Sequence, residues 1–89
     1  MKILVVNCGS SSLKYQLIDM NDEKVLAKGN FERIGEEEAF ITHKVNGEKY
    51  VIKNPVKNHD EALKIVLEQI VSEEYGVIKN LNEIDAVRT

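Results

Sequence analysis

The Asn46-Gly47 pair constrains this chain more than any other feature, because it separates two segments in which apolar and polar residues alternate. Asparagine followed by glycine favours a type I′ turn, in which both central residues take positive φ and connect two antiparallel strands. Such a turn also fixes the register of the strands. The predicted pairs are Val45 with Glu48, His43 with Tyr50, and Ile41 with Ile52. We therefore expect a β-hairpin with a mixed apolar face, in which His43 has a structural role.

The residues before this hairpin predict three strands joined by short connections. Residues 3–6 are consecutively apolar and mostly β-branched, which is typical of a strand that is central in its sheet and covered on both faces. Alternation over residues 12–19 places Leu13, Tyr15 and Leu17 on one face. A third strand is expected to present four residues on one face: Val25, Ala27, Gly29 and Phe31. Because the connections are too short for helices, the three strands form an antiparallel meander.

An amphipathic helix is expected to follow Pro55, with Asn58 as its N-cap. Glu61 lies three residues after Asn58, which is the spacing of a capping box. Apolar residues then recur at helical spacing and predict a face that packs on the sheet: Ala62, Leu63, Val66, Leu67 and Ile70. His59, at the first helical position, is expected on the surface. Gly76 is expected to stop the helix.

Residues 84–87 predict another short buried strand, and the chain ends at Thr89 directly after it. A buried strand is normally followed by chain that covers the far side of its sheet, so the fold is expected to be incomplete. With 89 residues, the sequence allows at most one small domain. We therefore predict the α/β class and a single partial domain over residues 1–89, built from a three-strand meander, a β-hairpin, a helix and a strand.

The composition excludes several classes of function. The net charge is -3 and the basic residues are scattered among the acids, so no basic face for nucleic acid is expected. No apolar stretch approaches the length of about 18 residues that spans a membrane, and the N-terminus lacks a signal-peptide core, which predicts the cytoplasm. Cys8 is the only cysteine and is expected to be a small, partly buried filler. The acidic run at 36–38 is expected to be solvated.

The segment NCGSSSLK, residues 7–14, interrupts the apolar pattern between the first two strands. It matches neither the P-loop nor the dinucleotide-binding glycine pattern. Its serine hydroxyls, the backbone N–H groups near Gly9 and the Lys14 ammonium can nevertheless donate hydrogen bonds to a phosphate. The Asn7 side chain adds a neutral oxygen suited to Mg²⁺ or its waters. Two interpretations remain open: a nucleotide-phosphate site, or a simple polar turn.

The same residues resemble a known family. The stretch MKILVVNCGSSSLKYQLIDM is similar to the N-terminal signature of acetate kinases, N-x-G-S-S-S-L-K. The likeness continues more weakly along the chain, through residues 31–35, the expected helix, residues 74–80 and residues 83–87. The resemblance implies the duplicated ribonuclease-H-like fold of sugar kinases, actin and Hsp70 chaperones, with residues 1–89 as its N-terminal part. It also implies phosphoryl transfer from ATP to acetate, giving ADP and acetyl phosphate, with Mg²⁺ as cofactor, in a cytoplasmic homodimer. The composition already predicts no nucleic-acid and no membrane partner.

The resemblance also implies roles for individual residues. Asn7 would belong to the Mg²⁺ site. Ser10 and Ser12 would approach the nucleotide phosphates, and Lys14 would bind ATP. No catalytic residue falls within residues 1–89, so this chain alone is expected to be inactive.

Two other functions remain as alternatives. One is a propionate kinase of the same family, because the acyl pocket is expected outside this segment. The other is a stand-alone, non-catalytic β-rich binding module. Beyond residue 87 the family continues with a Gly-His-Arg segment and an H-G-G turn, whereas this chain reads Arg88 and Thr89. Arg88 therefore receives no substrate role.

Overall fold

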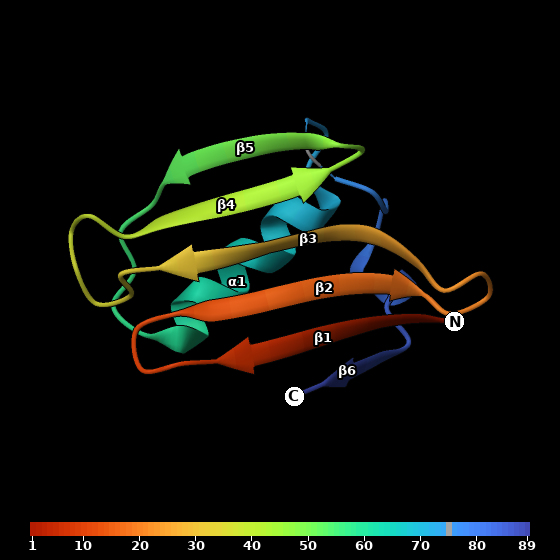
Figure 1. Ribbon diagram of the computed structural model, residues 1–89, viewed down its shortest axis with the longest axis horizontal. Helices are drawn as coiled ribbons and strands as arrows, with labels where there is room; N and C mark the ends of the chain where they lie inside the picture. Colours follow the sequence, from red (N-terminus) through yellow and green to blue (C-terminus); the bar gives the residue numbers. More distant parts are fainter. Residues whose placement is uncertain (75) are drawn as a thin grey trace.

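The computed structural model describes residues 1–74 and 76–89, which form a six-stranded sheet with an α-helix packed on one face (Figure 1). The strand order is β5-β4-β3-β2-β1-β6. All neighbouring strands are antiparallel except β1 and β6, which are parallel, so the sheet is mixed. The elements are β1 (Lys2–Cys8), β2 (Leu13–Asp19), β3 (Lys24–Glu32), β4 (Phe40–Val45), β5 (Glu48–Lys53), α1 (His59–Val71), the 3₁₀ helix η1 (Leu81–Glu83) and β6 (Ala86–Arg88).

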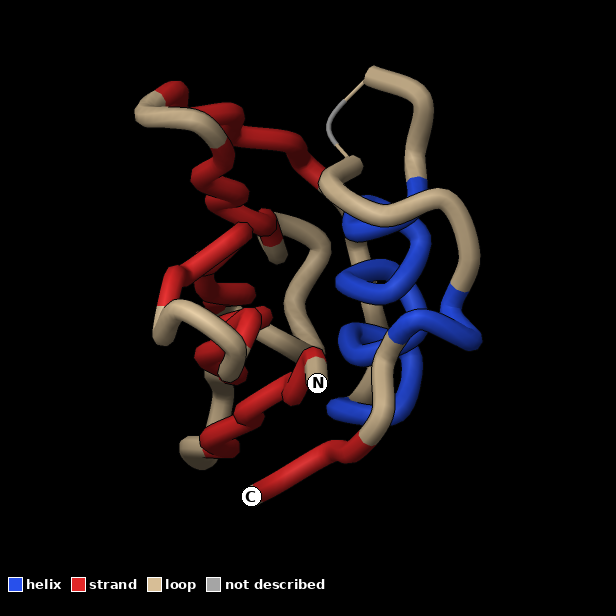
Figure 2. Tube along the Cα trace, turned by 90° about the vertical axis from the view of Figure 1, so that its right-hand side faces the viewer, coloured by secondary structure: helices blue, strands red, loops and turns tan. Residues whose placement is uncertain are grey.

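The sheet and α1 form two layers, which the side view of Figure 2 shows. The hydrophobic core lies between these layers. The alternation predicted for β2 is confirmed, because Leu13, Tyr15 and Leu17 are buried while their neighbours Lys14 and Gln16 are exposed. The helix contributes three fully buried residues: Ala62, Val66 and Ile70. Burial of apolar surface at this interface is the main stabilising contribution to the fold. We call the face of the sheet opposite α1 the open face.

The predicted hairpin is confirmed in turn geometry and in register. Asn46 and Gly47 have φ values of 53° and 77°, which are the positive values that a type I′ turn requires. All three predicted pairs are present: Val45 with Glu48, His43 with Tyr50, and Ile41 with Ile52. The meander of β1, β2 and β3 is confirmed as well.

His43 has the structural position that was predicted for it. Its side chain is fully buried, and its Nδ1 atom lies 2.6 Å from the Tyr15 hydroxyl oxygen. Gly29 lies beside the Tyr15 ring, because a Cβ there would be 2.6 Å from that oxygen and 2.0 Å from the carbonyl oxygen of Thr42. Burial raises the pKa of the Tyr15 phenol above its ordinary value, because the charged form would lose its water.

A β-bulge in β3 corrects the face assigned to Val25. Leu17 pairs with Ala27 but the next residue, Ile18, pairs with Val25, so Leu26 is the extra residue. The inserted residue moves Val25 to the open face, where its side chain is 44 % exposed. The sequence pattern could not show this, because it assumed unbroken alternation.

The beginning of α1 is as predicted, with a small difference in its capping. Asn58 is the N-cap, and its side chain accepts a hydrogen bond from the Glu61 amide at 3.0 Å. The Glu61 carboxylate accepts from the Lys57 amide at 3.1 Å, whereas a standard capping box would use the amide of the N-cap residue itself.

The end of the helix was predicted wrongly, because α1 stops at Val71 with Ser72 as its C-cap. Gly76 follows this end and donates its N–H to the Ser72 carbonyl at 2.9 Å. It is needed there for a close approach, since a Cβ would lie 2.3 Å from that carbonyl oxygen. The helix η1, which was not predicted, then begins at its own capping box of Asn80 and Glu83.

Three burial predictions near the two termini were wrong. Cys8 is exposed, so it fills no cavity. The strand near the C-terminus is β6 and it is not buried: Val87 is 58 % exposed. The first strand has neighbours on both edges, as expected of a central strand, but α1 covers only one of its faces (Figure 2).

Candidate functional site

The serine loop, residues 9–12, is a closed turn between β1 and β2. The Gly9 amide donates to the Ser12 carbonyl oxygen at 2.9 Å. A Cβ at Gly9 would lie 2.6 Å from the Ser12 hydroxyl oxygen, so glycine allows this side chain to approach the backbone. The loop is also held from outside, because the Ile34 amide donates to the Ser11 carbonyl at 2.9 Å. Ser10 is exposed and Ser12 is half-buried.

Asn7 and Lys14 lie opposite each other on β1 and β2, next to this loop. Lys14 in turn lies opposite Asn30 on β3, so three polar residues form a row across the open face. All three line a groove of about 390 Å³, whose other polar side chains include Gln16, Lys28 and Lys44. The structure therefore brings together two of the predicted site residues, Asn7 and Lys14.

The two predicted serines occupy a different part of the site. Ser10 and Ser12 lie in the loop at the end of the sheet and do not line the groove. Asn30 was not predicted. A signal for it existed, since Asn30 alternates with the residues of β3 that face the core. The register between β2 and β3 was needed to place it opposite Lys14.

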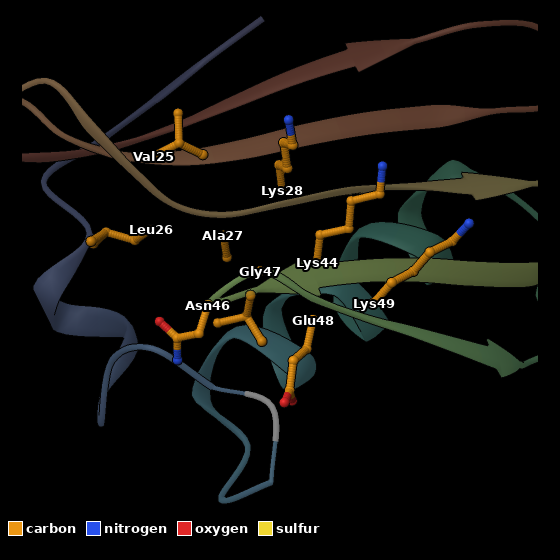
Figure 3. Close-up of a pocket in the computed structure, with 10 residues that line it drawn as sticks. Val25, Leu26, Ala27, Lys28, Lys44, Asn46, Gly47, Glu48 and Lys49 are labelled. Atoms are coloured by element: carbon orange, nitrogen blue, oxygen red, sulfur yellow. The ribbon is translucent and has the colours of Figure 1, made fainter.

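The groove is electrostatically positive. Among the described residues that line it, none is acidic and three are lysines: Lys14, Lys28 and Lys44. Lys28 on β3 lies opposite Lys44 on β4, and Lys44 lies opposite Lys49 on β5. Figure 3 shows Lys28, Lys44 and Lys49 on three neighbouring strands with their ammonium groups on the same side, while Glu48 points away. Three clustered cations favour an anionic ligand, and a phosphate has the matching charge.

A second pocket, of about 490 Å³, is lined by the hairpin turn together with Val25 and Leu26 (Figure 3). It shares Lys28 and Lys44 with the groove but includes none of the predicted site residues. The hairpin turn lies at the opposite end of the strands from the serine loop (Figure 1). This pocket is therefore not the candidate site.

The donor set fits part of a magnesium site. Asn7 supplies a neutral carbonyl oxygen on an exposed side chain, and Mg²⁺ takes oxygen ligands while keeping several waters. Within residues 1–74 and 76–89, no three side chains of His, Cys, Asp or Glu converge to hold a metal. A magnesium ion here would depend on Asn7, on water and on phosphate oxygens.

His59 also belongs to the site, which corrects its predicted place on the surface. Its Nε2 atom lies 2.7 Å from the Gly9 carbonyl oxygen and 3.0 Å from the Ser12 carbonyl oxygen. The ring is half-buried, and it connects the first residue of α1 to the serine loop. The local sequence around His59 carries no signal for this contact, because the partners are 50 and 47 residues away.

The chain is similar in sequence to the members of one protein family. The sequence model of the Acetokinase family matches residues 2–88. Acetate kinases from Clostridium kluyveri and Clostridium acetobutylicum are 66 % and 63 % identical over 87 residues, which are 98 % of this chain and 22 % of each relative. The chain thus spans about a fifth of the length of the curated relatives that it matches.

Solved structures show the same arrangement of elements. The acetate kinase of Porphyromonas gingivalis superposes with a TM-score of 0.93 at 42 % identity, covering 97 % of this chain and 22 % of that one. A propionate kinase from Francisella tularensis gives a TM-score of 0.79 at 27 % identity, over 97 % of this chain and 21 % of that one. The fold is therefore part of the actin, sugar-kinase and Hsp70 type.

The chain belongs to the Acetokinase family. No helix in the described part of the chain has the length and hydrophobicity needed to cross a bilayer.

Proposed function

We propose that the serine loop and the adjoining groove form one half of the ATP-phosphate and Mg²⁺ site of an acetate kinase. The observation that carries this proposal is the row of Asn7, Lys14 and Asn30 beside the loop, in a groove whose described lining residues include no acidic side chain. Membership of the Acetokinase family supports the same assignment. Residues 1–89 would be part of the N-terminal domain of the whole enzyme, which would act as a cytoplasmic homodimer.

The reaction is a transfer of the γ-phosphoryl group of ATP. A carboxylate oxygen of acetate attacks the γ-phosphorus, the bond to the bridging oxygen breaks, and ADP leaves with the electron pair. Such transfers depend chiefly on positioning and on neutralisation of charge. This segment would contribute to both requirements on the nucleotide side.

Each residue has a role that its position supports. The Lys14 ammonium would neutralise charge on the phosphate oxygens, and the Asn7 carbonyl oxygen would bind Mg²⁺ or one of its waters. Ser10 and Ser12 would donate hydrogen bonds from the loop. Mg²⁺ would supply charge neutralisation of the phosphates. No residue of this segment is proposed as the catalytic acid or base, so the 89-residue chain alone would not turn over ATP and acetate.

A titration of the ¹⁵N-labelled chain with MgADP tests this proposal. We expect the amide signals of residues 7–14 to shift, and Lys14→Gln to weaken binding about tenfold or more, because a charged hydrogen bond to phosphate is lost. Lys64→Gln is the matched control, since Lys64 is an exposed lysine on α1 away from the groove. Amide signals that do not shift at millimolar MgADP would contradict the proposal and favour a non-catalytic binding module.

A propionate kinase is the second candidate. The structural match to the Francisella tularensis propionate kinase supports it, although the sequence identity of 27 % is lower than the 42 % for the Porphyromonas gingivalis acetate kinase. The acyl pocket is expected outside this segment, so residues 1–89 alone do not distinguish the two acids. A longer protein carrying this segment would decide between the two acids by its ratio of kcat/KM values. A higher value for propionate than for acetate would replace the first assignment.

A further inference from the structure

We propose that His59 is a positioning residue that holds the serine loop in the shape needed for binding phosphate, an inference that rests on the proposed nucleotide site. The ring extends from the first residue of α1, and its Nε2 atom is within hydrogen-bond distance of two carbonyl oxygens of the loop. These oxygens belong to Gly9 and Ser12, the two residues that close the turn.

The contact determines where the histidine proton must be. Both partners of Nε2 are carbonyl oxygens, which only accept hydrogen bonds. Nε2 must therefore carry a hydrogen and share it between the two oxygens. This holds for the neutral tautomer protonated at Nε2 and for the imidazolium, so the contact fixes one nitrogen as a donor in either state.

The contact also determines the direction of a backbone donor. The Gly9 carbonyl belongs to the peptide unit that contains the Ser10 amide, and the described peptides are not cis. In a trans peptide the carbonyl and the N–H point in opposite directions. Because His59 holds the carbonyl toward α1, the Ser10 N–H is turned away from the helix. An N–H group so fixed is available to a phosphate oxygen without first having to be ordered.

His59 thus reduces the freedom of a loop of small and mostly exposed residues. Without it, the loop would depend on two backbone hydrogen bonds. One runs within the loop, from the Gly9 amide to the Ser12 carbonyl, and would open more readily because His59 would no longer hold that carbonyl. The other runs from the Ile34 amide to the Ser11 carbonyl. Neither of these two hydrogen bonds orients the Gly9 carbonyl. A loop that lost the His59 contact would have to order this peptide on binding, which lowers affinity.

Two substitutions of His59 separate a positioning role from general packing. His59→Gln keeps an N–H donor on a side chain of similar reach, whereas His59→Leu keeps apolar bulk without a donor. Gln69→Leu is the control, because it removes a polar side chain from the same helix near its other end. The readouts are hydrogen exchange of the Gly9 amide without nucleotide and the affinity of each variant for MgADP.

The expected result is faster Gly9 exchange and about tenfold weaker MgADP binding in His59→Leu, with recovery to within about threefold in His59→Gln. Unchanged Gly9 exchange in His59→Leu would overturn the inference. If the wild-type chain binds no MgADP while His59→Leu still loosens the loop, the proposed phosphate site fails and the phosphate role of His59 fails with it. If the wild type binds and His59→Leu binds equally well, only the positioning role is wrong.

A measurement on the wild-type chain keeps the inference testable even if His59→Leu does not fold. The ¹⁵N spectrum of the His59 ring at neutral pH should show a protonated Nε2. A ring protonated only at Nδ1 would contradict the proposed donation to Gly9 and Ser12.

Discussion

The substitution Tyr15→Phe tests the buried contact that connects β2 to β4. The hydroxyl oxygen of Tyr15 lies 2.6 Å from Nδ1 of His43, and the two side chains are 2 % and 0 % exposed. Their rings are stacked, with centroids 5.9 Å apart and an angle of 22° between the planes. Phenylalanine preserves the ring and its packing, so the substitution removes only the hydroxyl group.

The magnitude follows from the burial of both partners. Removing one side of a buried hydrogen bond leaves the other without that partner, which costs about 1–3 kcal/mol. For a domain of this size, each kcal/mol lowers the Tm by about 4–8 °C. We therefore expect Tyr15→Phe to lower the free energy of unfolding by about 1–3 kcal/mol at pH 7, measured by urea unfolding with circular dichroism.

A comparison of the wild type with Tyr15→Phe at alkaline pH gives a second, independent test. Burial raises the pKa of Tyr15 in the folded state above its value of about 10 in the unfolded state. The folded protein then keeps a proton that the unfolded chain releases, so this contribution to stability is fully present below about pH 10 and is lost as the pH rises from there toward the folded pKa.

The wild type should therefore lose about 1.4 kcal/mol per pH unit relative to Tyr15→Phe above pH 10, because the variant lacks the titrating group. All other side chains are the same in the two proteins, so their contributions cancel in the difference. A loss below about 0.5 kcal/mol at pH 7 would refute the account of the buried hydrogen bond. A difference in stability that stays constant from pH 9.5 to 11 would refute the account of the raised pKa.

Two further predictions concern the fold. Gly29→Ala should destabilise the chain by more than about 3 kcal/mol in urea unfolding, because the new Cβ would lie 2.0 Å from the backbone oxygen of Thr42. A loss of stability below about 1 kcal/mol would show that the strands can move apart at little cost. Asn58→Ala should cost about 1 kcal/mol by removing the acceptor for the Glu61 amide, while Asn58→Asp should preserve most of the stability. Equal losses in the two variants at position 58, measured by thermal unfolding, would contradict the capping role.

Several features of the fold were predictable because they depend on short stretches of chain. The positive φ values of Asn46 and Gly47 follow from the chemistry of the turn, and the turn alone fixes the pairing of β4 with β5. The start of α1 follows from the N-cap at Asn58 and the apolar spacing after it. The serine loop was likewise located by its local composition, and its likeness to acetate kinases led to the family.

The end of α1 and the face of Val25 show where local patterns are insufficient. Gly76 predicted a later stop, yet the helix ends at Val71, directly before Ser72, Glu73 and Glu74. The bulge that turns Val25 outward depends on how β3 pairs with β2, which the pattern in β3 alone cannot show.

The sequence by itself determined the class of fold, the hairpin register and the identity of the loop, because turn chemistry and periodicity act over a few residues. The tertiary structure decided how the site is assembled. Only the packing of α1 on the sheet brings His59 to the carbonyl oxygens of Gly9 and Ser12. Likewise, only the register of three strands places Asn30 beside Lys14. Such contacts join residues far apart in the chain, and their geometry depends on how whole elements pack, which no short stretch of sequence specifies.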